Sequence, residues 1–318
     1  MVDVLFIKTS SLGDVIHQMP AIAEARRHRA TARFSWIVEE AFAPLARLHP
    51  AVDEVIPVAS RRWRGNLHRP STWRDARDFA AAIRARRRDE VIDTQGLLRS
   101  ALIARLARGR RHGYDAESIR EPLASLFYDV RHRVARNLHA IERNRMLTGL
   151  ALGYALEGAL DYGLAAAGLA DRAAGRYAIL LHATARAEKE WPEECWIEVG
   201  SAPMLRGLGL LLPWGTAAER ARSERLASAL PQARVAERKP LDAVARMIAG
   251  ASLVVGVDTG LLHMAAALGV PLVAIFAGSD PRLTGPMGSG PIEIVGRRGC
   301  QPSARDVMTA LERMRPPP

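Results

Sequence analysis

Short apolar runs alternate with amphipathic helical segments through most of the 318 residues, and the alternation restarts near the middle of the chain. An almost continuous apolar run of strand length is typical of a strand covered on both faces, as in parallel sheets. Helical segments between such strands provide the crossovers that parallel pairing requires. The sequence therefore predicts an α/β protein with a parallel sheet in each half.

The predicted elements divide between the two halves. In the first half, strands are predicted over residues 2–8, 34–38, 54–58 and 90–93, and Arg-rich helices over 73–88 and 97–108. In the second half, strands are predicted over residues 177–182, 208–212, 253–257 and 272–276, and helices over 191–199, 217–230, 241–249, 259–268 and 303–314. The stretch between the halves, residues 149–176, is rich in Ala, Gly and Leu.

This order predicts two Rossmann-like domains, residues 1–155 and 156–318, whose parallel sheets face a central cleft. Ligands of such sheets bind at the carboxyl ends of the strands, so the cleft is the expected site. The last helix, residues 303–315, is a candidate to pack back on the first domain.

Positive charge is in excess and lies mainly in the first half. Lys and Arg number 45 against 34 Asp and Glu, a net charge of +11, and residues 1–160 carry +9 of it. A coding bias toward Arg accounts for the scarcity of Lys, whereas a one-sided charge favours an anionic partner for the first half. A nucleic acid is one such partner, but no RNA- or DNA-binding motif is present and aromatic residues are only 5%.

Composition also argues against several classes of protein. No apolar run approaches the ~20 residues of a membrane span, and the start of the chain does not resemble a signal peptide. Cys195 and Cys300 are too few for a disulfide framework or a four-ligand zinc site. We expect a soluble, cytosolic protein.

The sharpest motif is Asp-Thr-Gly-Leu-Leu-His at residues 258–263. Asp258 ends a predicted strand, Thr259 is a good N-cap residue, and Gly260 permits close approach to the backbone. The first N–H groups of the following helix suit a phosphate or pyrophosphate, and His263 shares that face. The alternative is an ordinary capped helix with a solvated histidine. Aspartic proteases also carry Asp-Thr-Gly, but on all-β folds.

A second strand-to-helix junction, residues 7–17, carries Asp14 after a turn of small residues. It is neither Gly-x-Gly-x-x-Gly nor a Walker loop, which argues against a dinucleotide dehydrogenase or a P-loop NTPase. Asp14 either complements the helix N-terminus or serves as a general base that faces the cleft.

Residues 182–192 follow another predicted strand and contain Thr184 and Lys189. A hydroxyl and an ammonium group at the carboxyl end of a strand can hold a pyrophosphate. The alternative is that Lys189 is a solvated surface residue. The loop 212–215, followed by Glu219, is a further candidate to face the cleft.

Arginines cluster at two places in the first half. Arg61, Arg62 and Arg64 follow one predicted strand, and Arg120 lies further along the chain. Clustered guanidinium groups clamp carboxylates and phosphates through paired hydrogen bonds. Most of two other Arg runs is interpreted as solvated face: residues 84–88 and 108–111.

Together these segments resemble the lipopolysaccharide heptosyltransferases of Gram-negative bacteria, which are GT-B glycosyltransferases. The similarity covers most of the chain, and several motifs in order are far more specific than any one alone. Residues 10–14, Ser-Ser-Leu-Gly-Asp, are similar to the type I enzymes, since the type II loop usually carries a Trp. The motifs that carry the resemblance are residues 8–14, 36–40, 61–64, 93–97, 120–128, 212–215 and 258–263.

The resemblance implies transfer of L-glycero-D-manno-heptose from ADP-heptose to the inner Kdo sugar of Kdo2-lipid A, with inversion at the anomeric carbon. Asp14 matches the family's proposed general base. The positions that match the donor site are Thr184, Lys189, Glu219, Asp258, Thr259, Gly260 and His263. The candidates for the acceptor side are Ser10, Gly13, Arg61, Arg62, Arg64 and Arg120.

The same resemblance implies no metal or other cofactor, in keeping with the lack of an Asp-x-Asp pair. It implies a cytoplasmic enzyme whose basic half contacts the anionic inner-membrane surface and which binds no nucleic acid. Two departures from the family stand out: Ala185 where paired threonines are frequent, and helix breakers over residues 200–209. A related ADP-sugar transferase with another acceptor is the alternative.

Overall fold

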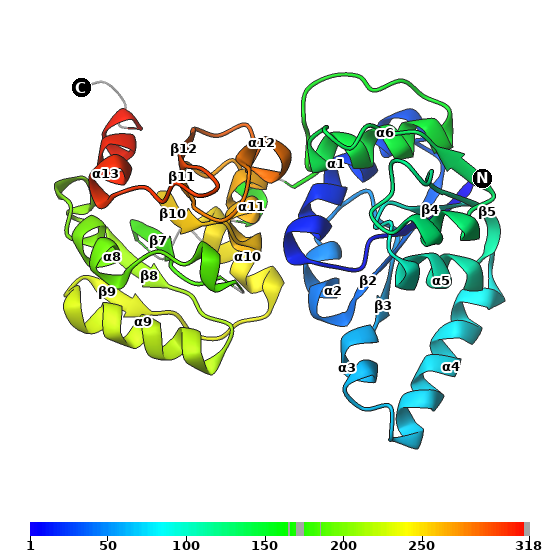
Figure 1. Ribbon diagram of the computed structural model, residues 1–318, viewed down its shortest axis with the longest axis horizontal. Helices are drawn as coiled ribbons and strands as arrows, with labels where there is room; N and C mark the ends of the chain where they lie inside the picture. The colour runs from blue at the N-terminus through cyan, green and yellow to red at the C-terminus, as the bar shows by residue number, and fades with distance from the viewer. Residues whose placement is uncertain (165, 170–174, 185, 315–318) are drawn as a thin grey trace. The chain divides into compact units, whose positions relative to one another are not determined.

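The computed structural model describes residues 1–164, 166–169, 175–184 and 186–314, and the chain divides into two compact units, Met1–Gly163 and Leu164–Pro318 (Figure 1). Each unit contains one six-stranded sheet, and the strands of both sheets pair in parallel. The predicted α/β fold with two parallel sheets is confirmed by this topology.

The first sheet has the strand order β3-β2-β1-β4-β5-β6, with β1 and β4 at its centre. β1 is buried along its whole length, as its near-continuous apolar run predicts. The strands of this first sheet are β1 (Asp3–Ile7), β2 (Arg33–Glu39), β3 (Glu54–Val58), β4 (Arg87–Asp93), β5 (Arg108–Tyr114) and β6 (Val130–His132). Its helices and 3-10 turns are α1 (Leu12–His28), η1 (Glu40–Phe42), α2 (Ala43–Ala46), α3 (Ser60–Arg64), α4 (Pro70–Ala85), α5 (Leu98–Leu106), η2 (Pro122–Phe127) and α6 (Ala140–Leu152).

The second sheet has the order β12-β11-β10-β7-β8-β9, with β10 and β7 at its centre. Its strands are β7 (Tyr177–Leu181), β8 (Gly209–Leu212), β9 (Ala233–Val235), β10 (Leu253–Val257), β11 (Leu272–Phe276) and β12 (Ile292–Gly296). Its described helices and 3-10 turns are α7 (Ala166–Leu169), η4 (Ala187–Lys189), α8 (Glu193–Gly200), η5 (Pro203–Leu205), α9 (Ala217–Ala229), α10 (Leu241–Ala249), α11 (Gly260–Ala267), α12 (Pro281–Thr284) and α13 (Ala304–Arg313).

The division between the units falls eight residues after the expected boundary at residue 155. Residues between 155 and 163 form contacts with α1 of the first unit. The Glu157 amide donates to the Glu24 carboxylate at 2.9 Å, and Asp161 pairs with Arg27 at 3.1 Å. These contacts explain why the stretch belongs with the first sheet.

Most arginines of the two runs are exposed or half-exposed, as expected, but Arg88 is buried and both runs contribute to strands. The helix predicted to reach Arg88 ends at Ala85, and Arg88 belongs to β4, where it is buried against Asp3 at 2.9 Å and Ser35 at 3.0 Å. The run that begins at Arg108 forms β5, a strand not predicted from the sequence. Its polar composition conceals the strand because ion pairs, rather than apolar burial, satisfy two of its arginines: Arg110 with Glu90 on β4, and Arg111 with Asp129 just before β6.

Three other strands were also not predicted: β6, β9 and β12. β6 and β9 are three residues long and end their sheets, so they carry little apolar pattern. The ends of α5 and α8 differ from the predicted ends by one or two residues, which is ordinary variation.

The last helix packs within the second unit. α13 lies against α8, β11 and β12, and its Val307, Ala310 and Leu311 join the core of that unit. α13 accordingly belongs to the second unit. The apolar stripe of α13 packs in the same buried core as Trp191 and Trp196 and shields that core from water.

The helix breakers over residues 200–209 fit the core closely. Gly200 ends α8 under the Leu230 side chain, and a Cβ there would lie 2.5 Å from Leu230 Cδ1. Leu205 in the following turn is buried, and Gly209 begins β8. The departure from the family pattern thus shortens a helix without leaving the segment unpacked.

Replacing Gly113 on β5 with Ala should lower the free energy of unfolding by about 1–3 kcal/mol, because the site is overpacked by any side chain. A Cβ there would lie 2.2 Å from the Tyr128 ring, whose hydroxyl donates to the buried Asp93 at 2.7 Å. Urea unfolding measures the loss. Gly65→Ala is the matched control, since its nearest heavy atom lies 3.8 Å away; equal stability of the two variants would contradict the prediction.

Candidate functional site

The carboxyl ends of the second sheet's strands gather the predicted donor residues at one edge. Thr184 follows β7, Trp214 follows β8, and Asp258 follows β10. Because neighbouring strands run parallel, side chains after their last residues share that edge. The structure therefore brings together segments that lie more than 70 residues apart in the sequence.

Asp258 is the centre of a hydrogen-bonded cluster at this edge. Its carboxylate is 7% exposed and receives Lys189 Nζ at 2.5 Å, the Ser279 hydroxyl, and His263 Nε2 at 3.6 Å. Thr184 Oγ1 donates to the Asp258 carbonyl at 3.3 Å. Four predicted donor residues thus meet within one network, and Lys189 is not a solvated surface residue.

Burial raises the pKa of Asp258, but hydrogen bonds from His263, Lys189 and Ser279 outweigh it and hold the pKa well below its usual range. The carboxylate is consequently ionised at neutral pH. It fixes the Lys189 ammonium group at the sheet edge, where that cation is available to an anionic ligand.

Ser279 is a site residue that the sequence interpretation missed. It lies three residues after the end of β11, and β11 is the strand next to β10. Gly278 directly precedes it. A Cβ on Gly278 would lie 3.0 Å from both the Glu188 carbonyl oxygen and Lys189 Cγ. The glycine therefore lets the Lys189 segment approach, and a small residue pair after a buried strand is the signal that marks it.

The N-terminus of α11 is arranged for an anion. Thr259 holds the N-cap position with an extended backbone, but its hydroxyl makes no capping hydrogen bond, contrary to the usual role of a threonine there. The first N–H groups of the helix, beginning at Gly260, combine with its dipole to favour negative charge. His263 lies in the same first turns.

Glu219 caps a different helix of the same edge. Its Oε2 accepts the amides of Gly215 at 2.6 Å and Thr216 at 3.1 Å, and its own amide donates to the Thr216 hydroxyl at 3.2 Å. Trp214 Nε1 donates to the Ala236 carbonyl at 2.8 Å. The loop after β8 is therefore held by the first turn of α9 and by the residue that follows β9.

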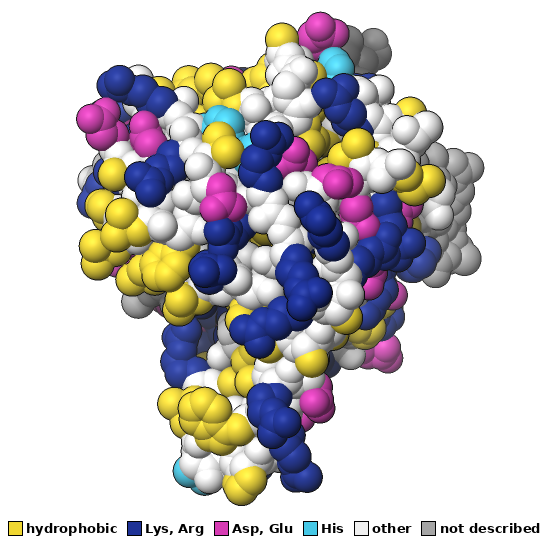
Figure 2. Space-filling model, turned by 90° about the vertical axis from the view of Figure 1, so that its right-hand side faces the viewer, with side chains coloured by type: hydrophobic (Ala, Val, Ile, Leu, Met, Phe, Trp, Pro, Cys, Tyr) yellow, Lys and Arg dark blue, Asp and Glu magenta, His cyan; other side chains and the backbone are white. Residues whose placement is uncertain are grey.

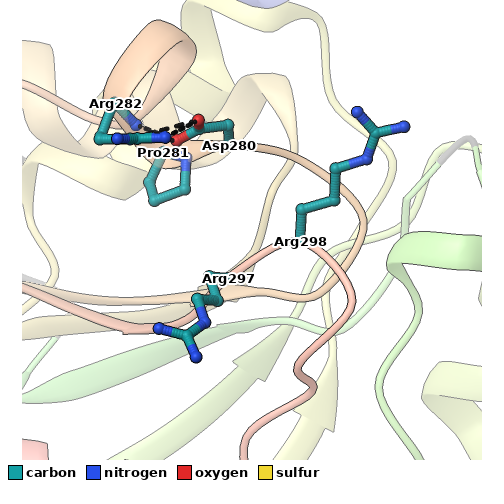
Figure 3. A pocket seen from close by; sticks show the side chains of 5 residues that line it. All are labelled: Asp280, Pro281, Arg282, Arg297 and Arg298. Atoms are coloured by element: carbon teal, nitrogen blue, oxygen red, sulfur yellow. Dashed lines mark hydrogen bonds and ion pairs between the residues drawn. The ribbon is translucent and has the colours of Figure 1, made fainter.

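A basic hollow of about 480 Å³ lies further along this edge, lined by residues that follow β11 and β12 (Figure 3). Arg282 turns onto Asp280 with its guanidinium 2.8 Å from the carboxylate, whereas Arg297 and Arg298 extend separately. Among the described residues, Arg297 and Arg298 form no ion pair, and β12, the strand they follow, lies beside β11, which in turn pairs with β10.

The second unit should lose stability as the pH falls from about 6.5 to 4. Burial lowers the pKa of His182, which contacts Ser223 Oγ at 2.8 Å, to about 4. In that window the unfolded chain takes up a proton that the folded unit excludes, so the free energy of unfolding falls by about 3 kcal/mol at most. Urea unfolding of wild type and His182→Gln checks this, the variant having the flatter pH profile.

His49 provides the control for that measurement. It is buried in the first unit, and burial lowers its pKa to about 4 as well. Because His49 is unchanged in His182→Gln, the pH dependence of the first unit should stay the same. The substitution should flatten the pH profile only of the unfolding transition reported by Trp191 and Trp196, which lie in the core of the second unit. An unchanged profile for that transition would contradict the assignment.

In the first unit, Asp14 lies in the first turn of α1, the helix that follows β1 after a short loop. Its Oδ2 accepts the Ser11 amide at 2.5 Å and the Ser11 hydroxyl at 3.2 Å, and its Oδ1 lies 3.9 Å from Lys8 Nζ. The side chain is 37% exposed. Asp14 therefore caps its helix and still presents a carboxylate oxygen at the edge of the sheet.

Lys8 is buried beneath Asp14 and holds the loop from below. Its Nζ donates to the Thr94 carbonyl at 2.9 Å and to Asn144 Oδ1 at 3.4 Å. Burial lowers the pKa of Lys8, while the nearby carboxylates of Asp14 and Asp93 oppose that shift. The lysine links β1 to β4 and α6 under the candidate base.

A second residue missed in the sequence, Gln95, positions the same loop. Its Oε1 accepts the amides of Thr9 at 3.1 Å and Ser10 at 3.2 Å. Gln95 is fixed in turn by Asp93 Oδ1, which accepts its amide at 2.8 Å. Burial raises the pKa of Asp93, although hydrogen bonds from Tyr128 and Ser100 oppose it. Residues 93–97 therefore support the segment that carries Asp14.

Three arginines line an open hollow of about 510 Å³ in the first unit: Arg64, Arg99 and Arg120. Arg99, which the sequence interpretation missed, donates to the Ser10 hydroxyl and so connects the hollow to the Asp14 loop. Within the described ranges, Arg64 and Arg120 form no ion pair. Two predicted acceptor arginines are thus brought together, facing solvent.

The other acceptor candidates are held differently. Arg62 pairs with Glu40 at 3.1 Å and Asp75 at 2.8 Å, and these hydrogen bonds raise its pKa. The Arg61 guanidinium lies 5.1 Å from the centre of the Phe42 ring. Gly13 is buried in the first turn of α1. Arg62 is therefore a structural cation in this conformation, while Arg61 remains exposed.

Among the residues that the structure describes, no helix is long and apolar enough to cross a bilayer. In the same ranges, no three His, Cys, Asp or Glu side chains come together as a metal ion would need.

Comparison with known proteins identifies the family. Residues 76–312 match glycosyltransferase family 9 (heptosyltransferase). The chain is 44% identical over 291 residues to lipopolysaccharide heptosyltransferase 1 of Escherichia coli strain K12, covering 90% of this chain and 91% of that protein. The chain belongs to the heptosyltransferase family.

Solved heptosyltransferase structures agree over nearly the whole chain. The E. coli heptosyltransferase WaaC with ADP matches with a TM-score of 0.91 and 40% identity, covering 99% of this chain and 100% of that one. The same enzyme with ADP-2-deoxy-2-fluoro heptose matches with a TM-score of 0.88 and 40% identity, covering 98% and 99%. The resemblance predicted from the motifs and the GT-B architecture are thereby confirmed. As a member of the heptosyltransferase family, the chain is a glycosyltransferase.

Proposed function

We propose that this chain transfers L-glycero-D-manno-heptose from ADP-heptose to the inner Kdo sugar of Kdo2-lipid A, in assembly of the lipopolysaccharide core. The observation that carries the proposal is the Asp258 cluster beside the start of α11, in a chain 40% identical to an enzyme solved with an ADP-heptose analogue. An ammonium group and the first N–H groups of a helix, both at one sheet edge, fit a nucleoside diphosphate.

On the donor side, Lys189 and the N-terminus of α11 stabilise the negative charge that develops on ADP as it leaves. Thr184 supplies a hydroxyl, Glu219 lies toward the ribose, and His263 lies beside the diphosphate. Asp258 keeps the ammonium group oriented through the 2.5 Å contact. These groups stabilise the charge on the leaving diphosphate, as a metal ion does in other enzymes, so the proposed reaction uses no cofactor.

On the acceptor side, Asp14 is the general base. The Kdo hydroxyl oxygen attacks the anomeric carbon as the bond from that carbon to the ADP oxygen breaks, and Asp14 takes the hydroxyl proton. A single displacement of this kind inverts the anomeric configuration. Arg64, Arg99 and Arg120 bind the phosphates and carboxylates of the acceptor from the adjoining hollow.

The location follows from the acceptor. Kdo2-lipid A is a glycolipid, so the enzyme acts in the cytoplasm at the inner face of the inner membrane. The +9 charge of residues 1–160 supports contact with that anionic surface, where each nearby cation contributes roughly 1 kcal/mol. No nucleic acid takes part.

Release of ADP tests the proposal. The protein is incubated with ADP-heptose, with and without Kdo2-lipid A, and the anomeric configuration of the product is determined by NMR. We expect ADP release that depends on the acceptor, and an inverted product. Donor binding without transfer to Kdo2-lipid A would favour a related ADP-sugar transferase with another acceptor. Tight, salt-sensitive oligonucleotide binding in a filter assay would favour a nucleic-acid-binding protein.

A further inference from the structure

Large exposed apolar side chains are concentrated in one part of the first unit. Among the described residues, and apart from Met1, the five most exposed of them lie between residues 67 and 126 and are each 53–66% exposed. Single exposed apolar residues are ordinary, whereas a concentration marks an interaction surface. The five are Leu67, Trp73, Leu102, Leu123 and Leu126.

Two of these residues form the tip of the hairpin made by α3 and α4, which projects from the sheet (Figure 1). Trp73 Nε1 donates to the Leu67 carbonyl at 2.9 Å, so the two residues are held together. The hairpin is closed by Trp63 against Phe79, with ring centres 5.6 Å apart. Its shape is therefore set by its own contacts, and its tip leaves an indole ring in water.

Arginines surround this apolar tip. Residues 60–86 contain eight Arg against two Asp. Of these, Arg62 and Arg86 form ion pairs with acidic side chains. Figure 2 shows the projection at the bottom, with apolar side chains at its tip and basic side chains beside and above them. The arginines of this segment with no ion pair in the described ranges are Arg61, Arg64, Arg69, Arg74, Arg77 and Arg84.

The remaining exposed leucines lie on elements next to residues that line the arginine hollow. Leu123 and Leu126 belong to η2, which begins two residues after Arg120 and packs on α5. Leu102 lies on α5 itself, four residues before the helix end. Because Arg64 and Arg120 line one hollow, the hairpin and η2 border the same basic region. We call the hairpin tip, η2 and the exposed side of α5 the docking face.

We infer that the docking face binds the surface of an anionic lipid bilayer, with Trp73, Leu67 and the η2 leucines entering the headgroup layer. Tryptophan favours that layer, because its ring is apolar and its N–H is polar. Arginines flanking it place their stems along the apolar boundary and their guanidinium groups on lipid phosphates. The inference rests on the proposed function, since an acceptor embedded in a membrane must be met at this surface.

Co-sedimentation with vesicles tests the inference without either substrate, so its failure is separate from failure of the proposed transfer. We expect wild type to bind vesicles of equal parts phosphatidylcholine and phosphatidylglycerol, and to be released by high salt. The double variant Leu67→Ser/Trp73→Ser should bind about tenfold more weakly. Leu150→Ser is the matched control, since Leu150 is an exposed leucine on α6 of the same unit.

Depth of insertion and turnover give two further readouts. Brominated lipids should quench the fluorescence of wild type more than that of Trp73→Phe, although both bind vesicles. The double variant should keep its turnover on Kdo2-lipid A stripped of its acyl chains, and lose about tenfold on the vesicle-embedded acceptor.

Three results would overturn the inference: no binding of wild type to anionic vesicles, equal binding by the double variant and wild type, or equal quenching of wild type and Trp73→Phe. A self-association that the double substitution abolishes, measured by sedimentation velocity and without vesicle binding, would assign the docking face to a second copy of the chain.

Discussion

Replacing Asp14 with Ala should reduce heptose transfer by about 10²–10⁴-fold, the usual contribution of a general base, while ADP-heptose binds nearly as well as before. The acceptor hydroxyl then has no carboxylate to take its proton in the transition state. The donor groups lie in the second unit, around Asp258, and the substitution leaves their contacts in place. Steady-state kinetics with Kdo2-lipid A and titration of ADP-heptose by calorimetry measure the two effects.

The cap that Asp14 provides requires a control, because loss of an N-terminal cap alone costs about 1 kcal/mol. Asp306 plays the same structural role at α13, where its Oδ2 accepts the Ser303 amide at 2.8 Å and the Ser303 hydroxyl at 2.7 Å. Asp306→Ala should lower stability by a similar amount and leave turnover unchanged. Unaltered turnover in Asp14→Ala would remove Asp14 as the base.

Replacing Lys189 with Ala should weaken ADP-heptose binding by about 30- to 100-fold, since a charge-assisted contact to the diphosphate is lost. It should also lower the free energy of unfolding of the second unit by about 2 kcal/mol, because the buried Asp258 carboxylate loses its closest cation. Ser279 and His263 remain to stabilise that carboxylate, which limits the loss. Calorimetry and urea unfolding measure the two quantities.

A double variant separates the two effects. Lys189→Met/Asp258→Asn removes both charges of the pair and should recover most of the stability, while donor binding stays weak. Lys239→Ala is the control for removal of a lysine from the same unit, since Lys239 pairs only with the exposed Glu237 at 3.6 Å. Recovery of donor affinity together with stability would show that Lys189 supports the fold rather than the ligand.

The cluster proposed as the donor site could be anticipated from the sequence because its residues follow buried apolar runs. β10 and β7 are continuous apolar strands, so Asp258 and Thr184 mark their ends and the parallel sheet brings those ends together. Ser279 escaped notice because a serine in a Gly-Ser-Asp loop also has the composition of an ordinary turn. Only the strand order, which places β11 beside β10, gives it a contact with Asp258.

The acceptor side was predicted less completely, because charge rather than hydrophobic pattern shapes it. Arg99 lies on an amphipathic helix where an arginine is expected to face water, and only the fold brings it to Ser10. Arg88 and the β5 arginines have the composition of a solvated surface, yet each is part of a strand. Sequence periodicity cannot distinguish an arginine paired across strands from one in solvent, since both appear as polar positions in the pattern.

The α3–α4 hairpin contributes little to the core of its unit: Thr72 and Ile83 are the buried residues of α4, and none of the five residues of α3 is buried. Such a segment can change in length and composition during evolution without threatening the sheet that holds Asp14. If the docking face meets the lipid surface as proposed, exchanging residues 60–86 between relatives would change lipid preference and leave the donor unit untouched. Arg61, Arg62 and Arg64 belong to the exchanged segment, so contacts with the acceptor would change with it.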